Sequence, residues 1–138
     1  MLFRSLDSSQ LLAAGLDATA LAGTLYHPPH WRARGGAAWD RKAVTLTGYV
    51  NYLGPVLDQR LTAASPVRGM TSYDLTATYR MPAGRPALAG IEFVLSVLNL
   101  TNARPAIIRQ TSPSIPPFDT TNYSVVGRFI SLTVSKHF

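Results

Sequence analysis

The sequence predicts an all-β protein built as an antiparallel β-meander of about five strands. Several long runs alternate apolar and polar residues, which is the pattern of strands whose side chains point to opposite faces. Ten glycines and ten prolines punctuate the 138 residues, as expected for a chain with many turns. Short and long connections alternate between these runs. The length of the chain suits a single domain.

Residues 1–30 are predicted to be a loop or a partial strand that leads into the sheet. The stretch 8–14 has the composition of a helix start, whereas Gly15, Thr19 and Gly23 favour loop or strand. Residues 31–138 are predicted to hold the strands.

The first two strands are expected at 31–39 and 43–53, joined by a tight turn at 40–42. A long polar connection with two prolines follows at 54–70. The apolar rows of these two strands contain the following residues: Trp31, Ala33, Gly35, Ala37 and Trp39, then Val44, Leu46, Gly48, Val50 and Tyr52.

The remaining strands are expected at 71–81, 91–100 and 123–138, separated by a nine-residue connection at 82–90 and a proline-rich loop at 103–122. Their apolar rows contain the following residues: Tyr73, Leu75, Ala77, Tyr79 and Met81; Ile91, Phe93, Leu95 and Val97; and Ile130, Leu132 and Val134.

The last ten residues carry the strongest pattern. Ile130, Leu132 and Val134 alternate with serine and threonine, and the chain closes on the aromatic Phe138. A strand of this length, with one apolar and one polar face, is typical of the wall of an outer-membrane barrel. An ordinary half-buried strand of a soluble sheet is the alternative. The alternation of short turns with long loops favours the membrane barrel.

Three segments resemble the carboxyl-terminal end of TonB-dependent outer-membrane receptors. The first, 25–39, has the Pro-Pro and Arg-x-Arg-x-Gly stretch followed by an aromatic residue. The second, 95–105, is similar to the family's Val-x-Asn-Leu strand end with a proline soon after. The third runs from the Phe-Asp pair at 118–119 through Gly-Arg at 127–128 to the terminal Phe138. Their order and spacing match the family across 25–138.

This resemblance implies an incomplete segment of a 22-stranded transmembrane β-barrel in the outer membrane. The parent receptor would import ferric siderophores or similar large nutrients. The implied partners are outer-membrane lipid, lipopolysaccharide and the barrel-assembly machinery, which would read Phe138 as its signal. Signal peptide, TonB box and plug are not recognisable in the chain, so we expect a truncated receptor that meets the TonB complex only through the missing plug.

Seven residues are candidates for a functional site. Asp74 and Arg80 share the polar face of one strand, and Glu92 joins them from the next; they are expected either to line a barrel lumen or to form a solvated face. The two long connections carry four arginines: Arg60, Arg68, Arg104 and Arg109. These arginines are expected either to bind an anionic siderophore or lipopolysaccharide phosphate, or to be solvated without a ligand.

Other chemistry is not predicted. The chain has no cysteine, which excludes thiolate catalysis. His27-Pro28-Pro29-His30 suggests a metal, but the prolines exclude a regular helix, and we favour a stiff polyproline-like lead-in. The net charge of +6 comes mostly from scattered bases, so nucleic acid is not an expected partner. We therefore expect no enzyme, metal or cofactor; a small soluble β-barrel that binds a lipophilic ligand is the alternative function.

Overall fold

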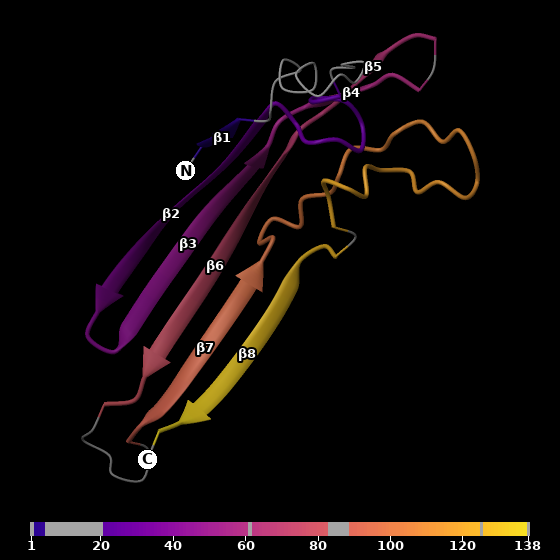
Figure 1. Ribbon diagram of the computed structural model, residues 1–138. Coiled ribbons are helices and arrows are strands. Elements are labelled where there is room, and N and C mark those ends of the chain that lie inside the picture. The colour runs from indigo at the N-terminus through magenta and orange to yellow at the C-terminus, as the bar shows by residue number, and fades with distance from the viewer. Residues whose placement is uncertain (1, 5–20, 61, 83–88, 125, 138) are drawn as a thin grey trace, which may run out of the picture. The chain divides into compact units, whose positions relative to one another are not determined.

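The computed structural model describes residues 2–4, 21–60, 62–82, 89–124 and 126–137, and within them the protein is all-β (Figure 1). The expectation of an antiparallel sheet of about five strands is confirmed. In the described part of the chain no helix is long and apolar enough to cross a membrane.

The main sheet is a meander in which sequence neighbours are also neighbours in space. Its order is β1-β2-β3-β6-β7-β8, and a separate hairpin is formed by β4 and β5. The bounds are as follows: β1 Leu2–Arg4, β2 Trp31–Arg41, β3 Val44–Leu53, β4 Val56–Asp58, β5 Ser65–Val67, β6 Met70–Arg80, β7 Ile91–Leu98 and β8 Phe129–Lys136.

The chain divides into two compact units, which are described separately. The sheet unit comprises Gly35–Asn51, Ser72–Ala103 and Val126–Phe138, and therefore most of the long strands. The loop unit comprises Met1–Arg34, Tyr52–Thr71 and Arg104–Val125, and therefore the β4–β5 hairpin and most of the long connections.

In the sheet unit, the strand register places apolar residues beside apolar residues. Leu95 of β7 is paired on its two sides with Ala77 of β6 and Leu132 of β8. The neighbouring row pairs Ser96 with Thr76 and Ser131 in the same way. Because paired residues of antiparallel strands point to the same face, β6, β7 and β8 share one apolar face and one largely polar face, which also carries Val94 and the Leu98–Phe129 pair. Figure 1 shows β7 between β6 and β8.

The same two faces continue onto β3 and β2. Asn51 of β3 donates a hydrogen bond to Asp74 of β6 at 2.8 Å, so the polar rows of these strands coincide. A Cβ added to Gly36 of β2 would meet the ring of Tyr49 in β3, which puts these two positions on the polar face as well. Trp39, three positions from Gly36, therefore belongs to the apolar face.

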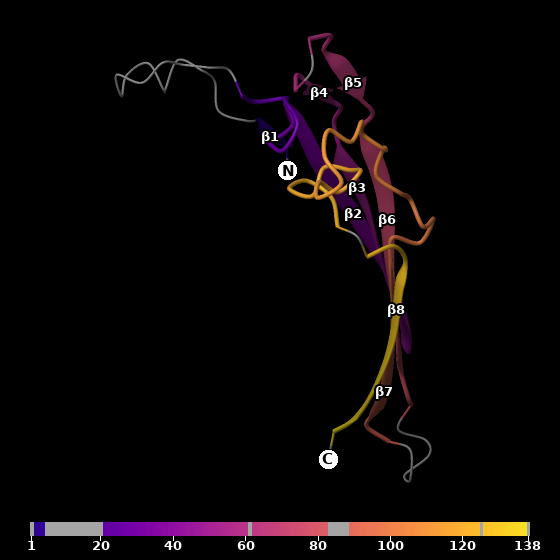
Figure 2. The same ribbon diagram turned by 90° about the vertical axis from the view of Figure 1, so that its right-hand side faces the viewer.

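The apolar face of the sheet unit is open. Ile130, Leu132 and Val134 are 61%, 65% and 58% exposed, and none of the described residues of this unit is buried. Figure 2 shows β7 and β8 close to edge-on as a single layer. The buried apolar side chains of the described residues all lie in the loop unit: Leu25, Pro29, Val56, Val67, Ile108 and Tyr123.

Three features differ most from the expectation, and other strand ends shift by one or two residues, as at the ends of β2 and β7. The tight turn is formed by residues 42–43, with Lys42 at a φ of 54°. The connection 54–70 contains the β4–β5 hairpin, because Val56 and Val67 pair and supply buried side chains. β8 begins at Phe129 rather than at Tyr123, because the Asp119 carbonyl accepts the Tyr123 N–H at 3.1 Å and holds this residue in a turn.

Gly36 should be required for the approach of β2 to β3. A Cβ there would lie 2.8 Å from the Gly48 carbonyl oxygen and would strike the Tyr49 ring, whereas a Cβ on the adjacent Gly35 would meet nothing within 4 Å. We expect Gly36→Ala to lower the free energy of unfolding by about 1–3 kcal/mol. Gly35→Ala, the matched control, should leave it unchanged or raise it by about 0.5 kcal/mol. Urea unfolding of the full chain in detergent micelles measures both, and equal effects would contradict the close approach.

Candidate functional site

The candidate site lies in the loop unit, where three chain segments pack around a small apolar core. The core consists of Leu25, Val56, Val67 and Ile108. Leu25 N–H donates to the Leu57 carbonyl at 3.0 Å, and Leu57 N–H donates to the Gly23 carbonyl at 2.7 Å. The segment before β2 is thus held against the β4–β5 hairpin by main-chain bonds, and Ile108 adds the β7–β8 connection.

Asp119 joins the β7–β8 connection to the segment before β2. Its side chain is fully buried, and its carboxylate accepts hydrogen bonds from the N–H groups of Tyr26, Thr121 and Asn122 at 3.0–3.2 Å. The Asn122 amide donates both to this carboxylate, at 2.7 Å, and to the His27 carbonyl, at 2.9 Å. A buried carboxylate needs such donors, so Asp119 fixes the conformation of both segments.

Tyr123, which follows this turn, is also buried. Burial raises the pKa of the Tyr123 hydroxyl, and the negative charge of Asp119 and the nearby Tyr52 raise it further. The Tyr123 hydroxyl is therefore neutral at physiological pH, which suits its place in the loop unit.

A second polar cluster is centred on Asp58 and Arg60. The Asp58 carboxylate accepts from Arg60 Nε at 2.9 Å, from Arg60 Nη2 at 2.8 Å and from the Arg60 backbone N–H at 3.1 Å. Arg60 Nη2 also donates to the Arg109 carbonyl at 2.8 Å. Hydrogen bonding to the Arg60 side chain lowers the pKa of Asp58, against an opposing effect of burial, and the charge of Arg109 adds to the lowering.

Tyr26 lies next to this cluster in a strained conformation. Its φ is 65°, which is uncommon for a bulky residue, and it lies in the turn in which the His27 N–H donates to the Thr24 carbonyl at 3.1 Å. The guanidinium carbon of Arg60 is 5.7 Å from the centre of the Tyr26 ring, within the range of a cation–π contact. The Tyr26 hydroxyl and Arg60 Nη1 are buried without a hydrogen-bond partner among the described residues.

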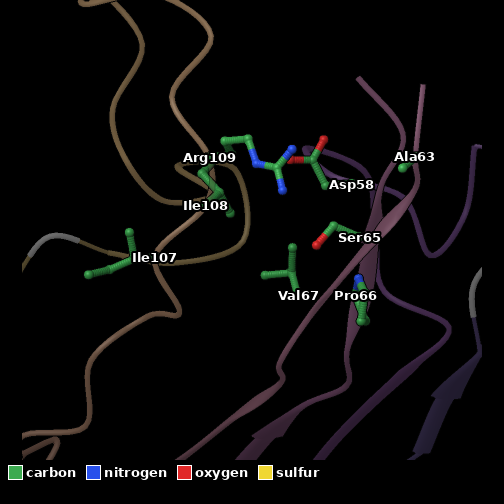
Figure 3. A pocket seen from close by; sticks show the side chains of 8 residues that line it. All are labelled: Asp58, Ala63, Ser65, Pro66, Val67, Ile107, Ile108 and Arg109. Carbon is green, nitrogen blue, oxygen red and sulfur yellow. The ribbon is translucent and has the colours of Figure 1, made fainter. Parts of the chain in front are cut away.

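A pocket opens beside the Asp58–Arg60 pair, and we call it the loop pocket (Figure 3). Its volume is about 50 Å³. Figure 3 shows the Arg109 side chain directed toward Asp58, with Ile107 on the same connection. The residues that line the loop pocket are Asp58, Ala63, Ser65, Pro66, Val67, Ile107, Ile108 and Arg109.

The four predicted arginines have different surroundings. Arg109 lines the loop pocket. Arg60 is held by Asp58 and touches the Arg109 carbonyl. Arg68 and Arg104 are exposed and line no part of this pocket. Of the four arginines predicted from the sequence, Arg109 thus lines the pocket and Arg60 supports the backbone beside it. Their roles as ligand contacts stay predictions.

The three predicted charges of the polar face fall into two groups. Arg80 and Glu92 are paired across β6 and β7, and Arg80 Nε donates to a Glu92 carboxylate oxygen at 2.5 Å. Asp74 instead accepts from Asn51 and, at 3.0 Å, from the Asn99 N–H at the end of β7. Phe138, the predicted assembly signal, lies outside the described residues.

The two histidines with prolines between them have local contacts. His27 Nδ1 is 3.0 Å from the Thr24 hydroxyl and 3.0 Å from the Leu25 carbonyl oxygen. His30 packs closely on Gly23, where a Cβ would strike its ring. In the part of the chain that the structure describes, no group of three or more His, Cys, Asp or Glu side chains is arranged to hold a metal ion.

Sequence reasoning missed several residues of this site, among them Tyr26, Asp58, Ser65, Ile107 and Asp119. Asp119 had a detectable signal, because an aspartate followed by Thr-Thr-Asn is typical of a side chain that caps its own turn. The others became recognisable only when the three segments were brought together.

Comparisons of this chain with protein-family models, with curated proteins and with solved structures gave no match. The site is therefore interpreted from its own geometry.

Asp119 should be essential for the order of the loop unit. Asp119→Ala leaves the N–H groups of Tyr26, Thr121 and Asn122, all in part-buried hydrogen bonds, without their acceptor, and we expect the loop unit to lose about 2–3 kcal/mol of stability. Amide hydrogen exchange at Leu25 and Leu57, whose N–H groups donate to main-chain carbonyls and not to Asp119, measures this loss. Asp40→Ala is the control, because exposed Asp40 accepts one hydrogen bond from the Thr45 hydroxyl and its loss should change stability by less than about 0.5 kcal/mol. Similar effects of the two substitutions would contradict the role of Asp119.

The Asp58–Arg60 pair should make the loop unit sensitive to acid. The pKa of Asp58 is lower in the folded chain than in the unfolded chain, so its stabilisation is fully present above the ordinary carboxyl pKa of about 3.9. This stabilisation is lost as the pH falls below that value through the lowered pKa. Hydrogen exchange of the Leu57 amide between pH 5 and pH 2 should show this decline in the wild type and a flatter profile in Asp58→Asn. Parallel profiles would show that the pair does not contribute.

Proposed function

We propose that this chain forms the carboxyl-terminal wall of a TonB-dependent receptor, as an incomplete segment of its 22-stranded outer-membrane barrel. The observation that carries the proposal is the open apolar face of the sheet unit. Ile130, Leu132 and Val134 are more than half exposed, and the register aligns them with the apolar rows of β6 and β7. In water such a continuous apolar surface is unfavourable, whereas in a membrane it contacts lipid.

The aromatic residues near strand ends also support a membrane environment for the sheet. Trp31 and Trp39, near the two ends of β2, are 52% and 50% exposed. Tyr73 and Tyr79 on the apolar row of β6 are 42% and 40% exposed. Amphipathic aromatic side chains of this kind gather at the two interfaces of a bilayer, and they would do so on an outer-membrane wall.

The opposite face of the sheet unit suits a wet barrel interior. Thr76 and Ser96 have their hydroxyls 3.3 Å apart, and Asn51 donates to Asp74. Arg80 and Glu92 form an ion pair on this face. Polar groups and charges are costly in lipid but ordinary in the lumen of a large barrel.

The function of the parent follows from the family resemblance. A complete receptor would import ferric siderophores or similar large nutrients, and it would meet the TonB complex through its plug. The chain itself would contact lipid and lipopolysaccharide, and Phe138 would signal to the barrel-assembly machinery. We propose no catalytic role. The alternative, a soluble β-barrel with a lipophilic ligand, would need a closed sheet; among the described strands β8 pairs with β7 alone, at one end of the strand order.

Lysine substitution on the two faces of β8 tests the membrane assignment. Leu132 lies on the apolar face and its neighbour Thr133 on the polar face. We expect Leu132→Lys to weaken the association of the full chain with phospholipid vesicles by about 2–4 kcal/mol, because the lysine faces lipid. Thr133→Lys should change it by less than about 1 kcal/mol. Vesicle flotation measures both variants.

Equal losses in the two variants would contradict a one-sided membrane surface. So would a monodisperse monomer that melts cooperatively in water without detergent.

A further inference from the structure

We propose that the loop pocket is a binding site for a small amphiphilic anion, a phosphate or carboxylate group carried on a short apolar chain. This inference goes beyond the membrane assignment and does not depend on it, because every residue that lines the pocket belongs to the loop unit.

The charges around the loop pocket sum to a positive value. The pocket contains one carboxylate, that of Asp58, and its two oxygens already accept three hydrogen bonds from Arg60. Arg60 therefore neutralises Asp58. Among the described residues, Arg109 has no ion-pair partner within 4.0 Å. The Asp58–Arg60 pair is neutral, so the guanidinium of Arg109 gives the pocket a net charge of one positive unit. A guanidinium of this kind is suited to a phosphate or carboxylate.

Two contacts fix the position of the Arg109 backbone. Arg60 Nη2 donates to the Arg109 carbonyl at 2.8 Å, and the neighbouring Ile108 is buried in the core of the loop unit. The backbone that carries Arg109 is thus held from two sides, while its side chain is exposed. A cationic group presented from a fixed backbone loses less entropy on binding than one on a free loop.

The loop pocket also has an apolar part. Ile107 is 86% exposed, the highest value among the exposed large hydrophobic side chains of the described residues, and it stands two positions from Arg109. Ala63, Pro66 and Val67 provide further apolar surface from the β4–β5 hairpin. An anion that also carries an apolar chain would cover Ile107, whereas a bare anion would leave it in water.

The size of the pocket limits the ligand. A single water needs roughly 10–15 Å³ of such space, and the loop pocket offers about 50 Å³. A phosphate or carboxylate group fits this space, with the Ser65 hydroxyl as an additional donor from the pocket wall. The apolar chain would extend out over Ile107.

The probe for the test is n-butyl phosphate, titrated into the full chain in a neutral detergent. The readout is the shift of the backbone amide signals of Ser65, Val67 and Ile108 in NMR spectra. We expect saturable shifts, with weaker binding of inorganic phosphate and none of butyltrimethylammonium. Arg109→Gln should weaken binding of n-butyl phosphate about tenfold, as the loss of one charged hydrogen-bonding group predicts.

Arg104→Gln is the matched control, because Arg104 is an exposed arginine of the same connection outside the pocket. It should leave the affinity within about twofold. Equal weakening in both variants would overturn the site in favour of diffuse attraction by the net positive charge. Absence of saturable shifts in a wild type that keeps its β-sheet circular dichroism spectrum would overturn it as well.

Ile107→Ser tests the apolar contact. It should reduce the preference for n-butyl phosphate over inorganic phosphate, and an unchanged preference would overturn the amphiphilic part of the proposal. Phosphatidic acid added to the micelles separates two sources of the anion: displacement of n-butyl phosphate supports a lipid headgroup, and no displacement supports a soluble ligand. The NMR readout reports only on amides of the loop pocket. A negative result in this titration is therefore distinguishable from a negative result in the vesicle flotation experiment, which tests the membrane assignment.

Discussion

The whole arrangement depends on one constraint, the need of an amphipathic sheet to have different surroundings on its two faces. In most folds a second layer covers the apolar face and forms a core. Here the described residues of the sheet unit include no such layer, and its strands keep their apolar side chains exposed. The order within this unit comes from the main-chain ladder and the cross-strand pairs, and the apolar face requires a surrounding medium to become stable. A lipid bilayer satisfies this requirement without any further protein layer.

The loop unit differs from the sheet unit, because its long connections are ordered by few apolar side chains. It uses a few buried side chains around Leu25 and two carboxylates that each accept several hydrogen bonds. Asp119 receives three main-chain N–H groups, and Asp58 receives Arg60. Such groups define one conformation only when all partners are in place. The loops are therefore a packed unit in their own right, and a pocket on them keeps its shape.

The sequence predicted the sheet well and the loop unit poorly, for a physical reason. Alternation is a local property, so the strands around Leu46, Leu75, Leu95 and Leu132 were recognisable from neighbouring residues alone. The β4–β5 hairpin has only three residues in each strand, too few for a period to appear. The start of β8 was placed too early, because the turn held by Asp119 competes with the strand pattern.

The outer edge of β8, at one end of the strand order, has a consequence for the isolated chain. Eight successive residues pair with β7 on one side, and the backbone groups on their other side have no neighbouring strand among the described ones. An edge of this length templates the addition of further strands, as in cross-β fibrils. Molecules of this chain therefore stay dispersed only while this edge is paired or covered.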